Sequence, residues 1–349
     1  MKSHKSMLGV LLIVPVGLAL ATLAMQGQSP ATVAVHMVVM VEPLRESDTT
    51  VPALSRQDVK VQQGKNNLQV TDWIPAKGDQ AGMQLFILID ETCDTSLGGQ
   101  LDDLRAFIKA QPATTWIGVG YMRNAGVNIV QNFTNDKDLA AKAIRLPLGS
   151  TGASDSPYLS LINLLQGWPE NKMRRSVIMI TDGVDRLRGL STPSGTAPPG
   201  RMGQGPGGPG GFGSPYQTMP AMSPDIDRAS TTAQRVGVIV NSIYFPGVGR
   251  AGRNYWELNN GQNGMSKLAD ETGGESFYLG LQTPVSFKPY FDRLRLIFDN
   301  QYFLAFQAIP GKKDGLQRVK ISTEVPKVEI VSADNVWVPA AGQPAGKNN

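Results

Sequence analysis

Two largely apolar runs of the sequence each end at an aspartate, residues 85–89 before Asp90 and residues 176–181 before Asp182. Continuous Val, Ile and Leu runs of this length are typical of parallel strands that are buried on both faces. Because ligands of open α/β sheets bind beyond the carboxyl ends of such strands, both carboxylates are expected at one edge of a sheet. Thr92 and Asp94 follow Asp90 closely and add further oxygens. Carboxylate and hydroxyl oxygens are ligands of hard cations, so this edge is a candidate site for a divalent ion.

Nucleophilic catalysis is disfavoured at the same edge. Cys93 is the only cysteine of the chain, which excludes an intramolecular disulfide. A catalytic thiol or hydroxyl needs a base within reach, and the only histidine outside the amino-terminal segment is His36, in a different part of the chain. We therefore predict that the protein is not an enzyme and that Cys93 is a small buried side chain.

Strand and helix patterns alternate between residues 83 and 300, and this predicts one α/β domain. Strands are predicted at residues 85–89, 116–121, 127–133, 176–181, 236–244 and 276–279, the third and the last of them at sheet edges. Helices are predicted at residues 101–108, 138–144, 158–165, 226–235, 265–272 and 287–298. The expected fold is a doubly wound, mainly parallel sheet flanked by helices, and Tyr255 and Trp256 are expected in a loop.

Shorter β segments precede and follow this domain, at residues 30–76 and 301–340. The first contains a β-branched run and two short strands around a Gly/Asn turn. In the second, residues 302–306 and 318–322 flank a Gly/Lys/Asp turn in the manner of a hairpin, and residues 328–331 add one more strand. We expect the two segments to pair as an accessory β module, with the α/β domain inserted between them.

Residues 1–24 have the pattern of a secretory signal peptide. Lys2 and Lys5 precede an apolar stretch that ends in small residues. Pro15 interrupts this stretch, so cleavage is favoured over an uncleaved anchor, and no other segment approaches the length of a membrane span. The mature chain is therefore expected to be secreted or periplasmic, with no membrane span.

Composition limits the remaining classes of function. The formal net charge is only +4, and two of the basic residues lie in the signal segment, so a nucleic-acid partner gains no support. Residues 189–223 are nearly half Gly and Pro, which cannot build a core, and they are predicted to be a disordered insertion that folding does not need.

The two aspartate motifs, residues 90–94 and 180–183, resemble those of the von Willebrand factor type A domain family. Residues 54–61, 268–277 and 301–304 resemble further segments of exported bacterial members, so the resemblance covers most of the mature chain. The resemblance implies a metal-ion-dependent adhesion site built from three loops.

Carried over by position, the resemblance assigns the following metal ligands: Asp90, Thr92 and Asp94 in the first loop, Ser154 in the second and Asp182 in the third. Thr151 is the alternative to Ser154. Asp94 departs from the family pattern, which has a second hydroxyl there, and adds negative charge beside the ion.

Such a site implies Mg²⁺, or Ca²⁺ or Mn²⁺, with an open position for a carboxylate of a protein ligand. The expected function is binding or adhesion between proteins through this ion. The alternative is a structural or scaffold protein of the same fold whose site is degenerate and free of metal.

Overall fold

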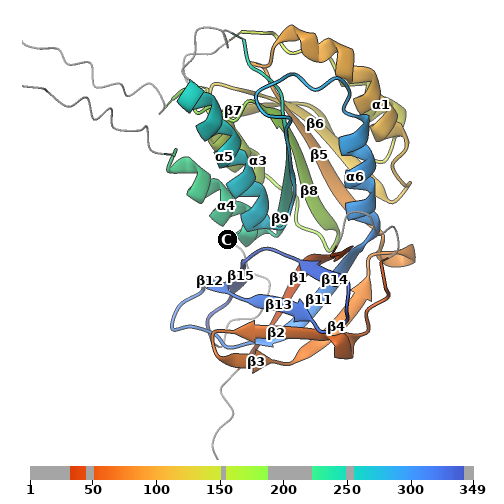
Figure 1. Ribbon diagram of the computed structural model, residues 1–349, viewed down its shortest axis with the longest axis vertical. Coiled ribbons are helices and arrows are strands. Elements are labelled where there is room, and N and C mark those ends of the chain that lie inside the picture. Colours follow the sequence, from red (N-terminus) through yellow and green to blue (C-terminus); the bar gives the residue numbers. More distant parts are fainter. Residues whose placement is uncertain (1–31, 45–50, 151–154, 188–221, 249–254, 342–349) are drawn as a thin grey trace, which may run out of the picture. The chain divides into compact units, whose positions relative to one another are not determined.

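The computed structural model describes residues 32–44, 51–150, 155–187, 222–248 and 255–341, all within one compact unit that begins at Thr32. Figure 1 gives the arrangement of its helices and strands. Three predicted features lie outside the described residues: the signal peptide, the second-loop candidates Thr151 and Ser154, and the Gly/Pro-rich insertion except for its last two residues.

A six-stranded sheet in the order β10-β9-β8-β5-β6-β7 forms the centre of the α/β domain. The strands are β5 (Met83–Asp90), β6 (Thr115–Arg123), β7 (Gly126–Thr134), β8 (Arg174–Thr181), β9 (Val238–Tyr244) and β10 (Ser276–Phe277). All neighbours pair in parallel except β7, which runs antiparallel to β6 at one edge. This order reverses between β5 and β8, as in doubly wound folds, and the predicted mainly parallel sheet is confirmed.

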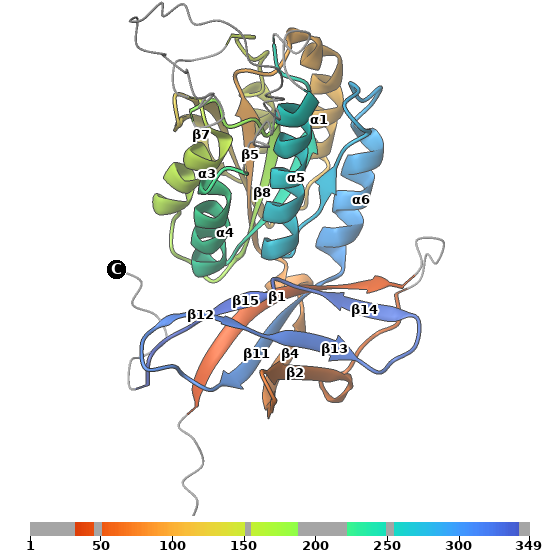
Figure 2. The same ribbon diagram turned by 60° about the vertical axis from the view of Figure 1, so that its left-hand side comes forward.

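Helices cover both faces of this sheet: Figure 1 shows α3, α4 and α5 on one side of the strands and α1 and α6 on the other, and Figure 2 shows α3 beside α4. Their bounds are α1 (Leu101–Lys109), α2 (Lys137–Lys142), α3 (Pro157–Gln166), α4 (Asp225–Val236), α5 (Tyr255–Thr272) and α6 (Lys288–Asp299). Every residue of β5 is buried. Leu85 and Ile87 pack in the same cluster as residues of α1 and α6, whereas Phe86 and Leu88 pack with α3 and α4. Alternation along one strand therefore supplies both cores.

Helix α5 begins ten residues before the prediction, and the predicted loop at Tyr255 and Trp256 was wrong because both lie in its first turn. The early turns contain Asn and Gly, which have low helix propensity. Gly261 and Gly264 lie where α5 closely approaches other elements, so tertiary packing outweighs helix propensity here. Among the described residues, none of the helices combines the length and the apolar composition that a membrane span requires.

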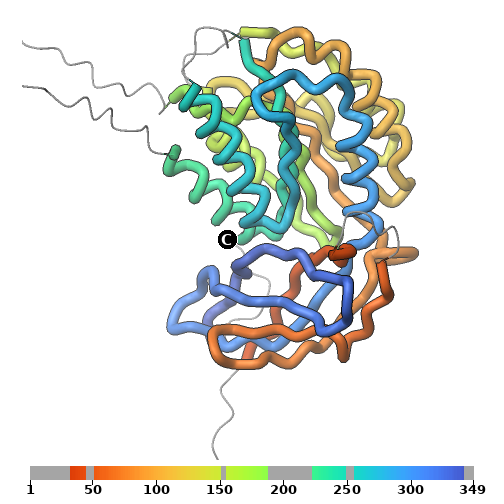
Figure 3. Tube along the Cα trace, viewed as in Figure 1, coloured from red at the N-terminus to blue at the C-terminus, as the bar shows by residue number. Residues whose placement is uncertain are grey.

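Strands from the two ends of the described chain form three further sheets, of order β14-β1-β11-β4, β13-β2-β3 and β12-β15. Their bounds are β1 (Val33–Pro43), β2 (Val59–Gln63), β3 (Asn66–Leu68), β4 (Val70–Pro75), β11 (Gln301–Ala308), β12 (Gly315–Arg318), β13 (Lys320–Thr323), β14 (Val328–Val331) and β15 (Asn335–Val338). Strand β1 pairs antiparallel with β11, with Met40 opposite Gln301. The red and blue segments of Figure 3 accordingly lie side by side.

The predicted hairpin between residues 302–306 and 318–322 was wrong. Strand β11 pairs with β1 on one side and with β4 on the other, so neither edge remains for the next strand. The chain turns instead into β12, which pairs with β15, and β13 pairs with β2. A local turn signal was overridden by partners more than 200 residues away in the sequence.

Candidate functional site

The two predicted carboxylates lie at the same edge of the central sheet. Strands β5 and β8 are neighbours, and their last pair is Ile89 with Ile180, so Asp90 and Asp182 lie one and two residues beyond it. Both side chains are buried, with 3% and 0% of their surface exposed. The parallel pairing of two apolar strands thus places two buried acids at the same edge of the sheet.

Protein hydrogen bonds occupy both oxygens of Asp90. Thr92 donates its backbone N–H to Oδ1 over 2.9 Å, and the Thr181 hydroxyl donates to Oδ2 over 2.6 Å. Burial and then the nearby charge of Asp182 raise the pKa of Asp90, whereas Arg186 and these hydrogen bonds oppose the rise. The ionised form of Asp90 is therefore stabilised by Arg186 and by the hydrogen bonds from Thr92 and Thr181.

Arg186 is the neighbour that sequence reasoning missed. Its Nη2 donates to Asp182 Oδ2 over 2.6 Å, and its Nη1 donates to the Val184 carbonyl over 3.2 Å. Only 8% of the side chain is exposed. Burial lowers the pKa of the guanidinium, but Asp182 and Asp90 raise it above its ordinary value. A permanent positive charge is thus built in beside both acids, and the spacing of four residues from Asp182 was its only signal in the sequence.

The backbone closes over this ion pair at Gly247. A Cβ atom at that position would lie 2.2 Å from Asp182 Oδ2 and 2.8 Å from Arg186 Nη2. The loop is held there because Asp94 donates its N–H to the Pro246 carbonyl and Val248 donates its N–H to the Thr92 carbonyl, over 2.9 and 2.8 Å. Any side chain at residue 247 would therefore displace the pair.

Thr92 and Cys93, between the two first-loop acids, are buried as well. In the described part of the chain, Thr92 Oγ1 is a buried oxygen with no hydrogen-bond partner. The Cys93 thiol belongs to the apolar core, which confirms the prediction of a buried side chain. Burial, followed by the charges of Asp90 and Asp182, raises the pKa of this thiol, so it does not form a nucleophilic thiolate readily.

Asp94 acts as a helix cap. It stands at the N-cap of the 3-10 helix Thr95–Gln100, and its Oδ1 accepts the Ser96 N–H over 2.8 Å. The bonds from Ser96 lower the pKa of Asp94. Its carboxylate is thus charged, half-exposed and engaged in shaping the loop that carries Thr92.

Replacement of Asp94 by alanine is expected to lower the free energy of unfolding by about 1 kcal/mol, the usual cost of a lost N-cap. Asp94→Ser keeps an acceptor oxygen and should stay within about 0.5 kcal/mol of the parent. Urea unfolding of the three proteins measures both differences. Equal stability of the alanine and serine variants would contradict the capping role.

Glu91, which directly follows Asp90, binds residues of the segment before α3. It forms an ion pair with Arg145 and accepts the Leu148 N–H over 2.7 Å. The Arg145 guanidinium also lies 3.8 Å from the centre of the Tyr121 ring. Glu91 therefore fixes the segment that leads to the second-loop candidates and adds no free charge to the acids of the edge.

The carboxylates among the candidate metal ligands that the structure describes are engaged by protein groups. Within the described ranges, no three His, Cys, Asp or Glu side chains converge as a metal centre requires. Each carboxylate oxygen of Asp90 and Asp182 has a protein partner, the last being the Val184 N–H, which donates to Asp182 Oδ1 over 3.0 Å. Of the candidate ligands that the structure describes, only the Thr92 hydroxyl lacks a hydrogen-bond partner. The five-residue ligand set remains a prediction.

No protein-family model and no curated protein matches the chain, but solved structures do. Several of them are von Willebrand factor type A domains. One from Catenulispora acidiphila is 10% identical over 90% of this chain and 75% of its own, with a TM-score of 0.39. The protein BatB of Bacteroides thetaiotaomicron is 11% identical over 61% and 95%, with a TM-score of 0.37. The A domain of SpRpn10 is 12% identical over 58% and 96%, with a TM-score of 0.30. Similarity this low assigns neither a family nor a function to the chain.

Proposed function

We propose that this chain is an exported, non-enzymatic binding module of the von Willebrand A type that presents the carboxyl edge of its central sheet to a protein partner without a divalent ion. The strands from the two chain ends form an accessory β module beside it. The observation that carries the proposal is the buried ion pair between Arg186 and Asp182.

Electrostatics favours the guanidinium over a metal ion at this edge. Two unit charges 4 Å apart interact by about 4 kcal/mol at an effective dielectric constant of about 20. By the same measure Arg186 would oppose a divalent ion beside it by about 8 kcal/mol, which offsets the attraction of one of the two acids. The arginine thus supplies the positive charge that the resemblance assigns to a cation.

The surroundings of the pair suit a protein partner. Leu146 and Leu148 are exposed on the segment before α3, and Tyr255 and Trp256 are exposed at the start of α5. Both segments lead into helices that begin at the carboxyl edge of the sheet (Figure 1). Exposed apolar and aromatic side chains beside polar loops are typical of protein interfaces.

A second candidate is binding through a divalent ion, Mg²⁺ or else Ca²⁺ or Mn²⁺, held by Asp90, Thr92, Asp94, Ser154 and Asp182. One observation favours it: the Thr92 hydroxyl is buried in the loop after Asp90 and lacks a hydrogen-bond partner among the described residues. Here the ion would link the edge to a carboxylate of the partner, and Arg186 would have to turn away.

Metal titration separates the two candidates. After treatment with a chelator, millimolar Mg²⁺, Ca²⁺ or Mn²⁺ is expected to leave the melting temperature unchanged. An ion bound with a Kd near 10 μM would instead add about 2.7 kcal/mol at 1 mM, which a thermal scan resolves easily. A rise that disappears in Asp90→Ala and persists in the surface control Asp102→Ala would establish the second candidate and overturn the first.

A further inference from the structure

Strand β1 has an edge that its neighbours leave open. Along one side it pairs with β11 from Val33 to Met40. Along the other side β14 covers only Met40–Pro43. Within the described residues, the seven residues before Met40 therefore have no hydrogen-bonded strand on the β14 side, and β15 lies near β1 without pairing with it.

The direction of the unpaired backbone groups follows from two hydrogen bonds. Val41 donates its N–H to Asn300 in line with β11, and Leu44 donates its N–H to Lys327 in line with β14, each over 3.0 Å. Backbone groups alternate in direction along an antiparallel strand. Odd-numbered residues of β1 therefore bond to β11, and Ala34, His36 and Val38 direct their N–H and C=O groups toward the open side.

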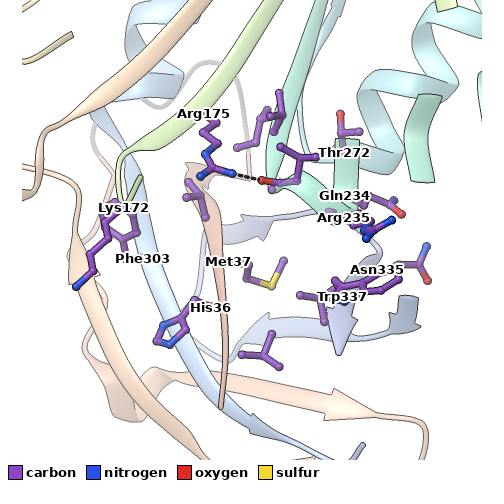
Figure 4. A pocket seen from close by; sticks show the side chains of 18 of the residues that line it. His36, Met37, Lys172, Arg175, Gln234, Arg235, Thr272, Phe303, Asn335 and Trp337 are labelled. Atoms are coloured by element: carbon purple, nitrogen blue, oxygen red, sulfur yellow. Dashed lines mark hydrogen bonds between the residues drawn. The ribbon is translucent and has the colours of Figure 1, made fainter. Parts of the chain in front are cut away.

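These residues line a groove of about 730 Å³ (Figure 4). The facing wall comes from the start of β9 and the end of α4, and β15 contributes Val336 and Trp337. Five consecutive residues of β1 line it, which corresponds to about 17 Å of strand. The groove thus follows the open edge along its length.

The groove is positively charged. Its lining includes Lys172, Arg175 and Arg235, with Asp314 as the only acid among the lining residues. Arg175 donates to the carbonyls of Val236 and Asn171 over 2.6 and 2.9 Å, and these neutral groups hold it without cancelling its charge.

Two further observations describe the surroundings of Arg235 and Arg175. The Arg235 guanidinium lies 5.0 Å from the centre of the Trp337 ring. Burial lowers the pKa of Arg175, and Glu170, which is not a lining residue, opposes this. An extended chain with acidic side chains complements both the backbone edge and the charge.

We propose that this groove binds an extended acidic segment of a partner protein, which pairs with β1 at Ala34–Val38 as an added strand in line with β14. Main-chain hydrogen bonds to Ala34, His36 and Val38 supply affinity, and the three basic residues select Asp and Glu side chains. An unpaired edge is a template for such pairing. The site lies beside the amino ends of β8 and β9, away from the acids of the carboxyl edge, so it stands independently of the proposed function.

The test uses a ten-residue peptide of alternating Val and Glu, with a Val/Lys peptide of the same length as its control. Fluorescence anisotropy should show binding of the Val/Glu peptide at least about tenfold tighter than that of the Val/Lys peptide. Hydrogen exchange should show the N–H groups of His36 and Val38 exchanging fast in the free protein and becoming protected in the complex. No binding, or equal binding of the two peptides, overturns the proposal.

His36→Pro removes an N–H that faces the groove and leaves the bonds to β11 in place, a change that edge strands tolerate. It should weaken binding of the Val/Glu peptide by about tenfold or more, whereas His36→Ala keeps the N–H and should bind as the parent does. Lys172→Glu, outside the strand, should also weaken binding and does not depend on tolerance of proline. Unchanged binding in Lys172→Glu, or in a folded His36→Pro protein, overturns the proposal.

A second copy of the chain is the competing occupant of the same edge. Analytical ultracentrifugation of the free protein would then reveal a dimer, and the N–H groups of His36 and Val38 would be protected without any peptide. That result would overturn the proposed acidic partner and show that the open edge of β1 serves self-association.

Discussion

Replacement of Arg186 by methionine is expected to lower the free energy of unfolding by about 3–5 kcal/mol, the usual cost of removing one partner of a buried ion pair. The loss is large because Asp182 is fully buried and Asp90 lies beside it. Methionine keeps most of the volume and removes the charge together with the hydrogen bonds to Asp182 and Val184. Urea unfolding at neutral pH measures the difference.

The same variant should gain a response to metal. With the guanidinium gone, the charges of Asp90 and Asp182 are no longer opposed by Arg186, so millimolar Ca²⁺ or Mg²⁺ should raise the melting temperature of Arg186→Met but not of the parent. Asp182→Asn in the same chain removes the uncompensated charge and should restore stability without metal. If the unfolding free energy of Arg186→Met lay within about 1 kcal/mol of the parent value, Arg186 would not neutralise this edge.

Stability of Arg186→Met should also depend on pH in a defined direction. The pKa of Asp90 is already raised in the parent protein, and loss of Arg186 removes one of the influences that oppose the rise. A carboxyl whose pKa is higher in the folded than in the unfolded state stabilises the fold below the unfolded value, near 3.9, and loses this contribution as pH rises through the folded value. Between pH 4 and pH 8, the variant should therefore lose stability more steeply than the parent.

Gly261→Ala is expected to destabilise the protein by about 2–3 kcal/mol, in the range of overpacked cores. A Cβ atom there would lie 2.5 Å from the Asp182 carbonyl oxygen and 3.0 Å from the Gly183 carbonyl carbon. Both are backbone atoms of the loop that carries the buried acid, so α5 or the loop must move. This cost exceeds the ~1 kcal/mol that alanine gains in helix propensity.

Gly99→Ala is the matched control for Gly261→Ala, because a Cβ at Gly99 meets nothing within 4 Å. Its unfolding free energy should stay within about 0.5 kcal/mol of the parent. Equal effects of the two substitutions would show that α5 can shift freely against the Asp182 loop.

Sequence reasoning succeeded where one local pattern decides the structure. The apolar runs at residues 85–89 and 176–181 became β5 and β8, because burial on both faces leaves no room for polar residues. The helix predicted at residues 226–235 is α4, and Gly237 ends it with a φ of 71°. The meeting of Asp90 and Asp182 also followed from parallel strands that share an edge.

The failures have distant causes. The start of α5 depends on the close approach of Gly261 to the Asp182 loop, which no helix propensity records. The hairpin prediction failed because β11 finds both of its partners far away in the sequence. Arg186 was missed because its importance comes from burial against Asp182 in the folded state, whereas a charged residue in a polar loop is usually solvated.

The pairing of β1 with β11 has a consequence for the order of assembly. Val33 to Met40 are synthesised before the α/β domain, and their partners from Gln301 to Ala308 come after it. Strand β1 must therefore remain without this partner while more than 250 residues are made, and pairs of such high sequence separation close slowly. The α/β domain, whose strands and helices alternate locally, can fold first and bring the two distant segments together. We therefore expect β1 to be completed only after the α/β domain has formed, and a chain interrupted before Gln301 to expose an apolar strand along both edges.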